Sequence, residues 1–222
     1  MNVDEANRRP ISQRSHGWAQ TCMQMLVKAK ISPNAISFSS IVFAAAAGAC
    51  LYVSARNDGG LRVLALFGGA LFCQLRLLAN MMDGMVAVEA GTGGPDGPVW
   101  NELPDRIADI LVLVGAGYAV AHLGLADATL GWAAAVAAVM TAYVREVVRG
   151  AGAPADFSGP MAKPHRMFVM TMAALISTFE PLLSWPHGAV LNVALWIVLA
   201  GAIFTALNRA RRGLAILNKK AP

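Results

Sequence analysis

The sequence predicts an all-α integral membrane protein with six transmembrane helices and an N-terminal amphipathic helix that lies in the membrane interface. Three observations predict this class. The 222 residues are 56% hydrophobic and only 14% charged, whereas soluble domains carry about 25% charged residues. Six apolar stretches approach the roughly 20 residues that a helix needs to cross a bilayer. Lysine and arginine residues are concentrated in segments that lie on one side of these stretches, and the positive-inside rule predicts such an excess on the cytoplasmic side.

The N-terminal segment, residues 1–34, carries five basic residues and mixes them with apolar ones at roughly helical intervals. This pattern is typical of an amphipathic helix in the membrane interface, with an ordinary solvated helix as the alternative. The run from Ile31 to Asn34 contains Ser32 and Pro33, which end this helix and begin the next one. The segment lacks the apolar stretch of a secretory signal peptide, so we expect no cleavable signal.

The membrane domain is expected over residues 35–212, followed by a basic cytoplasmic tail at 213–222. Its six predicted spans cover residues 35–55, 60–88, 103–124, 126–148, 166–184 and 188–209. Most basic residues lie before the first span, around the junction of the fourth and fifth, and at the end of the sixth, whereas the opposite side has Arg56 and Arg62. This imbalance places both termini in the cytoplasm at a bacterial-type inner membrane. Gly115 and Gly131 begin small-xxx-small patterns, which bring helices together either within one chain or between two chains.

An acidic helical hairpin is predicted around the end of the second span and the start of the third. Small and polar residues recur there at intervals of three or four, so each set shares one helix face. The sets are Asn80, Asp83 and Ala87 on the second span, and Asn101, Asp105 and Asp109 on the third. A turn rich in glycine and proline joins the segments. Carboxylates brought together repel unless a hard cation neutralises them. The residues therefore predict a divalent-metal site on the cytoplasmic side, with a structural polar cluster as the alternative.

The same stretch resembles the signature of the CDP-alcohol phosphotransferase (phosphatidyltransferase) family, D-x-x-D-G-x-x-A-R-x8-G-x-x-x-D-x-x-x-D. The matching residues are Asp83, Gly84, Ala87, Asp105 and Asp109. Three positions depart from the signature: Asn80 replaces the first aspartate, Val88 the arginine and Asn101 the second glycine. Aligned in this way, the linker between the two halves is longer than the family's by about four residues.

The resemblance implies an enzyme of phospholipid synthesis that moves a phosphatidyl group from CDP-diacylglycerol to a small polar alcohol and releases CMP. It also implies Mg2+ or Mn2+ as cofactor and a homodimer in membrane lipid. The implied metal ligands are Asp83, Asp105, Asp109 and the neutral Asn80, and Asp109 is also the implied catalytic base. The nucleotide is implied to lie against Asn80, Asp83, Gly84 and Ala87, where small residues permit close approach.

A second group of functional residues is expected on the cytoplasmic side, after the fourth span. Its members are Arg145, Arg149, Lys163, His165 and Arg166. Arg145 and Arg149 lie one helix turn apart, and a turn rich in glycine and proline returns Lys163 to the same surface. A basic cluster beside a metal site suits the phosphate of a phosphorylated acceptor alcohol. Positive-inside topology with contact to anionic lipid is the alternative.

Rival functions stay open at this stage. A related enzyme would use CDP-choline or CDP-ethanolamine as donor and a lipid alcohol as acceptor. A non-catalytic relative would bind CDP-lipid or a cation, and the three departures from the signature favour it. A cation transporter is disfavoured because the membrane midplane carries no matching acidic path. The sequence has no nucleic-acid-binding motif and no phosphate-binding glycine loop, so we expect no nucleic-acid partner.

Overall fold

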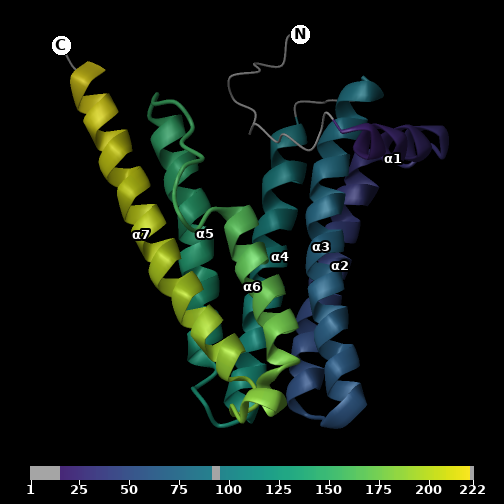
Figure 1. Ribbon diagram of the computed structural model, residues 1–222. Coiled ribbons are helices and arrows are strands. Elements are labelled where there is room, and N and C mark those ends of the chain that lie inside the picture. The colour runs from purple at the N-terminus through teal and green to yellow at the C-terminus, as the bar shows by residue number, and fades with distance from the viewer. Residues whose placement is uncertain (1–15, 92–95, 221–222) are drawn as a thin grey trace.

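The computed structural model describes residues 16–91 and 96–220, so residues 1–15 of the predicted N-terminal segment and the last two residues of the tail lie outside it. Within these ranges the chain is helical, as predicted. Its elements are α1 (Gly17–Lys28), α2 (Pro33–Ala55), α3 (Gly59–Glu89), α4 (Gly97–His122), α5 (Thr129–Gly150), α6 (Lys163–Ser177), the 3-10 helix η3 (Glu180–Leu183) and α7 (Ala189–Lys220). Figure 1 shows α2 to α7 running roughly along one axis, with α1 lying across one end of the bundle.

α1 packs on the end of the bundle through one apolar face. Ala19 and Met23 are buried and form one cluster with methionines of α3, whereas Trp18 on the same helix is 53% exposed. The predicted break between α1 and α2 is present. Ser32 caps α2, because its Oγ accepts a hydrogen bond from the backbone N–H of Ala35 at 3.2 Å, and a side-chain acceptor at this position satisfies a free helix donor.

Four helices in the described part of the chain are long and apolar enough to cross a membrane: α2, α3, α5 and α7. The predicted count of six spans is therefore not confirmed. α4 has 26 residues, but its first half contains the acids of the predicted hairpin together with Arg106. α6 has 15 residues, which extend about 22 Å against a hydrocarbon core of about 30 Å. The span expected at 166–184 instead ends at Ser177 and gives way to η3.

α6 begins partway along the bundle rather than at its end (Figure 1). The segment before it, residues 151–162, turns inward, so that Met161 and Ala162 are buried. Thr205 of α7 fixes this segment, because its Oγ1 accepts a hydrogen bond from the backbone N–H of Met161 at 3.1 Å. This inward course brings Lys163 and Arg166, on the first turn of α6, to Asp105 and Asp109 of α4.

Glycine contacts hold α2, α4 and α5 together. A Cβ built on Gly115 of α4 would lie 2.5 Å from the Cα of Gly48 on α2, and one built on Gly131 of α5 would lie 2.7 Å from the Cα of Gly117. A side chain does not fit at these distances, so the helix backbones themselves are in contact. The small-residue patterns predicted from the sequence thus serve packing within one chain.

The outer faces of the long helices are apolar, and charged side chains lie inside. Phe67 and Leu71 of α3 and Phe204 and Leu207 of α7 are each more than half exposed, whereas Arg76 of α3 is 0% exposed. Large exposed apolar faces mark contact with lipid or a partner. This distribution suits a protein whose helices face a bilayer.

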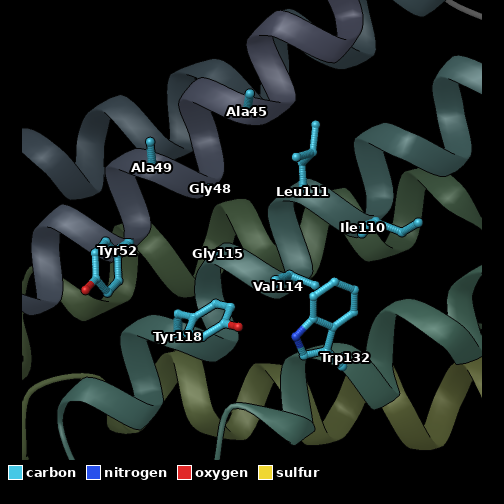
Figure 2. Close-up of a pocket in the computed structure, with 10 residues that line it drawn as sticks. All are labelled: Ala45, Gly48, Ala49, Tyr52, Ile110, Leu111, Val114, Gly115, Tyr118 and Trp132. Atoms are coloured by element: carbon cyan, nitrogen blue, oxygen red, sulfur yellow. The ribbon is translucent and has the colours of Figure 1, made fainter.

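A groove of about 370 Å³ lies between α2, α4 and α5. Figure 2 shows Tyr52, Tyr118 and Trp132 around it, with the backbone of Gly48 and Gly115 between them. None of its lining residues is charged. The charged residues described next are therefore separate from this groove.

Candidate active site

A buried cluster of charged side chains lies between α3, α4 and the start of α6. Its acids are Asp83, Asp105 and Asp109, and its bases are Arg76, Lys163 and Arg166. Each acid is at most 5% exposed, and the two arginines are at most 1% exposed. A buried charge is costly unless it is paired and hydrogen-bonded. The partners of each acid therefore indicate whether its carboxylate is already neutralised or could still bind an ion or a proton.

Asp109 is held between two arginines. Arg166 donates to its Oδ2 at 2.5 Å, and Arg76 donates to its Oδ1 at 3.0 Å. Both oxygens thus bind a guanidinium group, and the side chain is 0% exposed. Across residues 16–91 and 96–220, no three histidine, cysteine or acidic side chains gather closely enough to hold a metal ion. Two arginines from distant segments thus neutralise Asp109, one of the three carboxylates predicted to bind the metal.

Asp105 is in contact with an amine. The Lys163 Nζ donates to Oδ2 of Asp105 and also to Oδ1 of Asn80, so the ammonium group bridges α3 and α4. Oδ1 of Asp105 is buried and has no hydrogen-bond donor among the described residues, although Arg76 Nη2 lies 3.5 Å away. Oδ2 of this carboxylate therefore accepts a hydrogen bond from a lysine, whose side chain is flexible. Oδ1 has no hydrogen bond among the described residues.

Asp83 is held by neutral donors. The Ser37 hydroxyl of α2 donates to Oδ2 at 2.7 Å, and the backbone N–H of Gly84 donates to Oδ1 at 2.5 Å. Ser37 is 3% exposed and was not identified from the sequence. A buried hydroxyl in an apolar span is the signal that could have found it, because polar groups at membrane depth usually have a partner or a function.

The structure changes how the chain is aligned with the family signature. α4 begins at Gly97, and eight residues, 89–96, separate Gly97 from Val88, as the x8 of the signature requires. Gly97 thus occupies the second glycine position, Asn101 the third aspartate and Asp105 the fourth. The prediction that Asn101 replaces the glycine after a lengthened linker is corrected, and Asp109 lies one helix turn beyond the signature.

The residues predicted to meet the nucleotide differ in exposure. Gly84 and Ala87 are half-buried near the end of α3, whereas Asp83 is buried. Asn101, a signature position outside the predicted nucleotide set, is exposed on α4. Val88, at the position of the signature arginine, is 54% exposed. Two of the four acidic positions of the signature, Asn80 and Asn101, are therefore neutral in this chain, and the position of the arginine is apolar.

The five predicted phosphate-binding residues do not share one environment. Arg145 is paired with Glu102 at 2.5 Å and with Glu146 at 2.7 Å, and its guanidinium lies over the ring of Phe157. Arg149 has a 43% exposed side chain near Glu146, and His165 is exposed. Lys163 and Arg166 bind Asp105 and Asp109 as described above. The structure thus brings two of the five, Lys163 and Arg166, into contact with the aspartates of the buried cluster.

Arg209 of α7 is a further buried residue that sequence reasoning treated only as a mark of topology. It is 5% exposed, and its guanidinium donates to the carbonyl of Thr141 at 2.7 Å and to that of Ser158 at 2.9 Å. It therefore ties α7 to α5 and to the segment that leads into α6. Its position in a C-terminal run of basic residues hid this role.

The sequence is similar to phosphatidylinositol phosphate synthases of mycobacteria, although no family model matches it. It is 31% identical to the enzyme of Mycobacterium marinum over 147 residues, which are 65% of this chain and 61% of that protein. It is 30% identical to the enzyme of Mycobacterium tuberculosis over 148 residues, 65% of each protein. The match thus spans a little under two thirds of these relatives.

Solved structures of the phosphatidylinositol phosphate synthase of Mycobacterium tuberculosis share the fold. The complex with manganese and citrate matches with a TM-score of 0.71 and 22% identity over 88% of both chains. The structure with CDP-DAG bound matches with a TM-score of 0.70 and 22% identity over 88% of this chain and 92% of the other. The resemblance that the motif predicted is confirmed by these relatives.

Proposed function

We propose that this chain, a homologue of the phosphatidylinositol phosphate synthases, is a CDP-alcohol phosphatidyltransferase. It transfers the phosphatidyl group of CDP-diacylglycerol to a small polar alcohol and releases CMP. The observation that carries the proposal is the pair of carboxylates that α3 and α4 contribute at signature positions, Asp83 and Asp105, beside the Asn80 amide. The similarity to synthases of this class, one of which has been solved with CDP-DAG bound, supports it.

A divalent ion, Mg2+ or Mn2+, fits the donors at this place. Asp83 and Asp105 offer carboxylate oxygens and Asn80 an amide oxygen, which are the ligands that these hard ions prefer. Oδ1 of Asp105 is buried and has no hydrogen-bond donor in the described ranges, so it is suited to coordinate the ion. The manganese in the structure of a relative supports this assignment. When bound, the ion would neutralise diphosphate charge and make CMP a better leaving group.

Asp105 is the residue we assign as base. Family analogy gives proton transfer to the fourth aspartate of the signature, which is Asp105 once Gly97 is aligned. It would accept the proton of the acceptor hydroxyl as that oxygen attacks phosphorus. Asp109 is not used in this step, because both of its oxygens bind arginines.

The nucleotide is proposed to lie against α3, where Gly84 leaves room for close approach. Val88 cannot bind a phosphate. Arg106 is proposed to take that part, because its Nη2 lies 3.7 Å from Asp105 and its side chain is 16% exposed. The acceptor's phosphate, where one is present, would meet the exposed His165 and Lys163, whose flexible stem lets it leave Asp105. Arg145 and Arg166 are buried and stay paired with Glu102 and Asp109.

The site is proposed to face the cytoplasm in a homodimer. α1 and the C-terminal end of α7 lie at the same end of the bundle (Figure 1), and the charged cluster is near the end of α3 that meets α1. The basic residues that the positive-inside rule assigns to the cytoplasm are concentrated in the N-terminal segment and at the C-terminal end of α7. The orientation would be tested by replacing the exposed Arg211 of α7 by cysteine and labelling that thiol from one side of a membrane.

The function is tested by incubating the purified full chain in lipid nanodiscs with CDP-diacylglycerol, Mn2+ and one alcohol at a time. We expect CMP release with at least one acceptor from a panel of inositol phosphate, glycerol phosphate and their unphosphorylated parents. Loss of turnover in Asp105→Asn, with retention in Arg211→Met, would support the assigned site. Turnover that needs CDP-choline or CDP-ethanolamine would instead indicate the related enzyme class.

A non-catalytic relative that binds CDP-lipid is the second candidate. It is favoured by the two neutral signature positions, Asn80 and Asn101, together with Val88. Binding of CDP-diacylglycerol without CMP release from any acceptor would select it and overturn the proposed transfer.

A further inference from the structure

A lysine side chain lies where the acidic positions of α3 and α4 face one another. Lys163 is the first residue of α6, and its ammonium group donates to Asn80 on one helix and to Asp105 on the other. Its side chain is 14% exposed. An amine bound by one oxygen from each helix occupies the same kind of place as a bridging cation.

The charge of the cluster explains why the amine is bound there. Arg76 and Arg166 together neutralise Asp109. Asp105 is 1% exposed, and a buried carboxylate without a close positive partner is strongly destabilising. Arg76 and Arg106 approach it only at 3.5 and 3.7 Å, so the ammonium group of Lys163 is its closest positive partner. Replacement of two signature aspartates by asparagine has also removed two negative charges from this part of the chain.

An ammonium group and a divalent ion cannot use these oxygens at the same time. Both would use the carboxylate of Asp105 and Oδ1 of Asn80, to which the ammonium group already donates, and two cations at one carboxylate repel strongly in a buried site. Lysine can leave, because its flexible four-carbon stem carries a single charge and its neighbours Pro164 and His165 are exposed. Arg76 and Arg166 are 0% and 1% exposed and have no comparable route to water.

We propose that Lys163 is a tethered cation that fills the oxygen site of Asn80 and Asp105 and is displaced when a divalent ion binds. The proposal rests on the proposed metal site but not on turnover. Each ion that binds must break the contacts of Lys163, so the lysine weakens the ion's apparent affinity. Displacement also frees the ammonium group beside the place where an acceptor would lie.

The test measures Mn2+ binding to the purified full chain by the electron paramagnetic resonance signal of free Mn2+. We expect Lys163→Met to bind Mn2+ about tenfold or more tightly than wild type, since hydrogen bonds to a charged group are worth at least about one decade in affinity. Lys163→Gln, which is polar and uncharged, should change affinity in the same direction. Arg211→Met, which removes an exposed positive charge from α7, should stay within about twofold, as a screened surface charge does.

Two further variants locate the effect. Lys163→Arg keeps a cation and should not tighten Mn2+ binding. Asp105→Asn combined with Lys163→Met should abolish the tight binding; if it persists, the ion lies elsewhere and the proposal is overturned. Unchanged or weaker Mn2+ affinity in both Lys163→Met and Lys163→Gln, each shown to be folded by its thermal transition, would overturn it as well.

The outcomes for the proposed function are separate. CMP release by wild type with unchanged Mn2+ affinity in the neutral Lys163 variants rejects the tethered cation and keeps the transferase. Tighter Mn2+ binding in those variants without CMP release from any alcohol keeps the tethered cation and rejects the transferase.

Discussion

The chain buries charge at both ends of α3, and the two groups are built differently. Near the start of α3, Arg62 pairs with Glu180 at 2.5 Å, and the same carboxylate accepts hydrogen bonds from the backbone N–H groups of Gly188 at 2.8 Å and Val190 at 2.9 Å. Near its end, about 30 Å away, Asp83 has neutral donors and Asp105 has one oxygen without a hydrogen bond in the described part of the chain.

The difference distinguishes an acid that holds elements of the fold together from the acid that we propose for chemistry. Glu180 is 0% exposed, has one cationic partner and uses both oxygens, so it joins α3 to η3 and the start of α7. Asp105 has a displaceable lysine as its partner. Both acids are buried charges in a membrane protein, and only their partners reveal which one is available for chemistry.

Replacing Asp105 should have the largest effect on activity and little effect on folding. Loss of a general base typically lowers a rate about 10²- to 10⁴-fold, so Asp105→Asn should lower CMP release by that factor. The initial rate with saturating CDP-diacylglycerol and acceptor is the measurement. Near-wild-type turnover would mean that Asp105 is not the base.

Replacing Glu180 should do the reverse. Glu180→Gln leaves the Arg62 guanidinium buried without its counter-charge, which should lower the free energy of unfolding by about 3–5 kcal/mol. Unfolding in mixed micelles of increasing SDS content measures this loss. Turnover per folded molecule should stay unchanged.

A double variant sharpens that result. Arg62→Met combined with Glu180→Met removes both charges, and replacement of a buried pair by apolar residues is often nearly neutral. Stability should therefore recover relative to Glu180→Gln. A double variant as unstable as the single one would show that the backbone contacts of Glu180, rather than its pairing with Arg62, hold this end together.

The bond between Ser37 and Asp83 should have an intermediate effect. Ser37→Ala removes a hydrogen bond to a buried carboxylate, which is worth about 1.5–3 kcal/mol. The same SDS titration measures the change, and Ser37→Thr, which keeps the hydroxyl, is the control. Equal stability of the alanine and threonine variants would indicate that this bond adds nothing to the fold.

The smallest effect concerns pH and the segment before α6. Burial raises the pKa of Asp156, but hydrogen bonds from Ser158 and the charges of Arg209 and Arg212 outweigh it and hold the pKa below the usual value. The folded state therefore binds this proton less readily than the unfolded state. The stabilisation should be complete above about pH 4, the ordinary aspartate range, and should be lost as pH falls through the lower folded value.

Unfolding curves of wild type and Asp156→Asn between pH 3 and pH 7 would detect this contribution. The two proteins should differ at neutral pH and converge towards the acid end. A difference that stays constant with pH would mean that ionisation of Asp156 does not contribute.

Hydropathy alone predicted the helices that are apolar throughout. α2, α3, α5 and α7 match the expected spans at 35–55, 60–88, 126–148 and 188–209 to within a few residues, apart from the C-terminal extension of α7. The expected span at 166–184 is not confirmed, because its helix ends at Ser177 and an apolar run does not reveal that end. The inward course of residues 151–162 depends on contacts with α7, such as that of Thr205, which no local pattern encodes.

The sequence predicted the acids of the candidate site but not their individual partners. Helical spacing correctly put Asp105 and Asp109 on one face of α4, and the same spacing made them look equivalent. They differ because Arg76 and Arg166, far apart in the sequence, both reach Asp109. Counting eight residues from Val88 to Gly97 would have found the signature alignment from the sequence. The position of the Lys163 amine could not be found in this way.

The contact between Gly48 and Gly115 has a consequence for genetics. Because even a methyl group at position 115 would collide with the backbone of α2, a saturation mutagenesis screen for growth should score this glycine as intolerant to every replacement. Such a score would rank it beside Asp105, although Gly115 carries no side chain that could take part in chemistry. Intolerance in this protein therefore marks the tightest helix crossing as readily as the reacting groups.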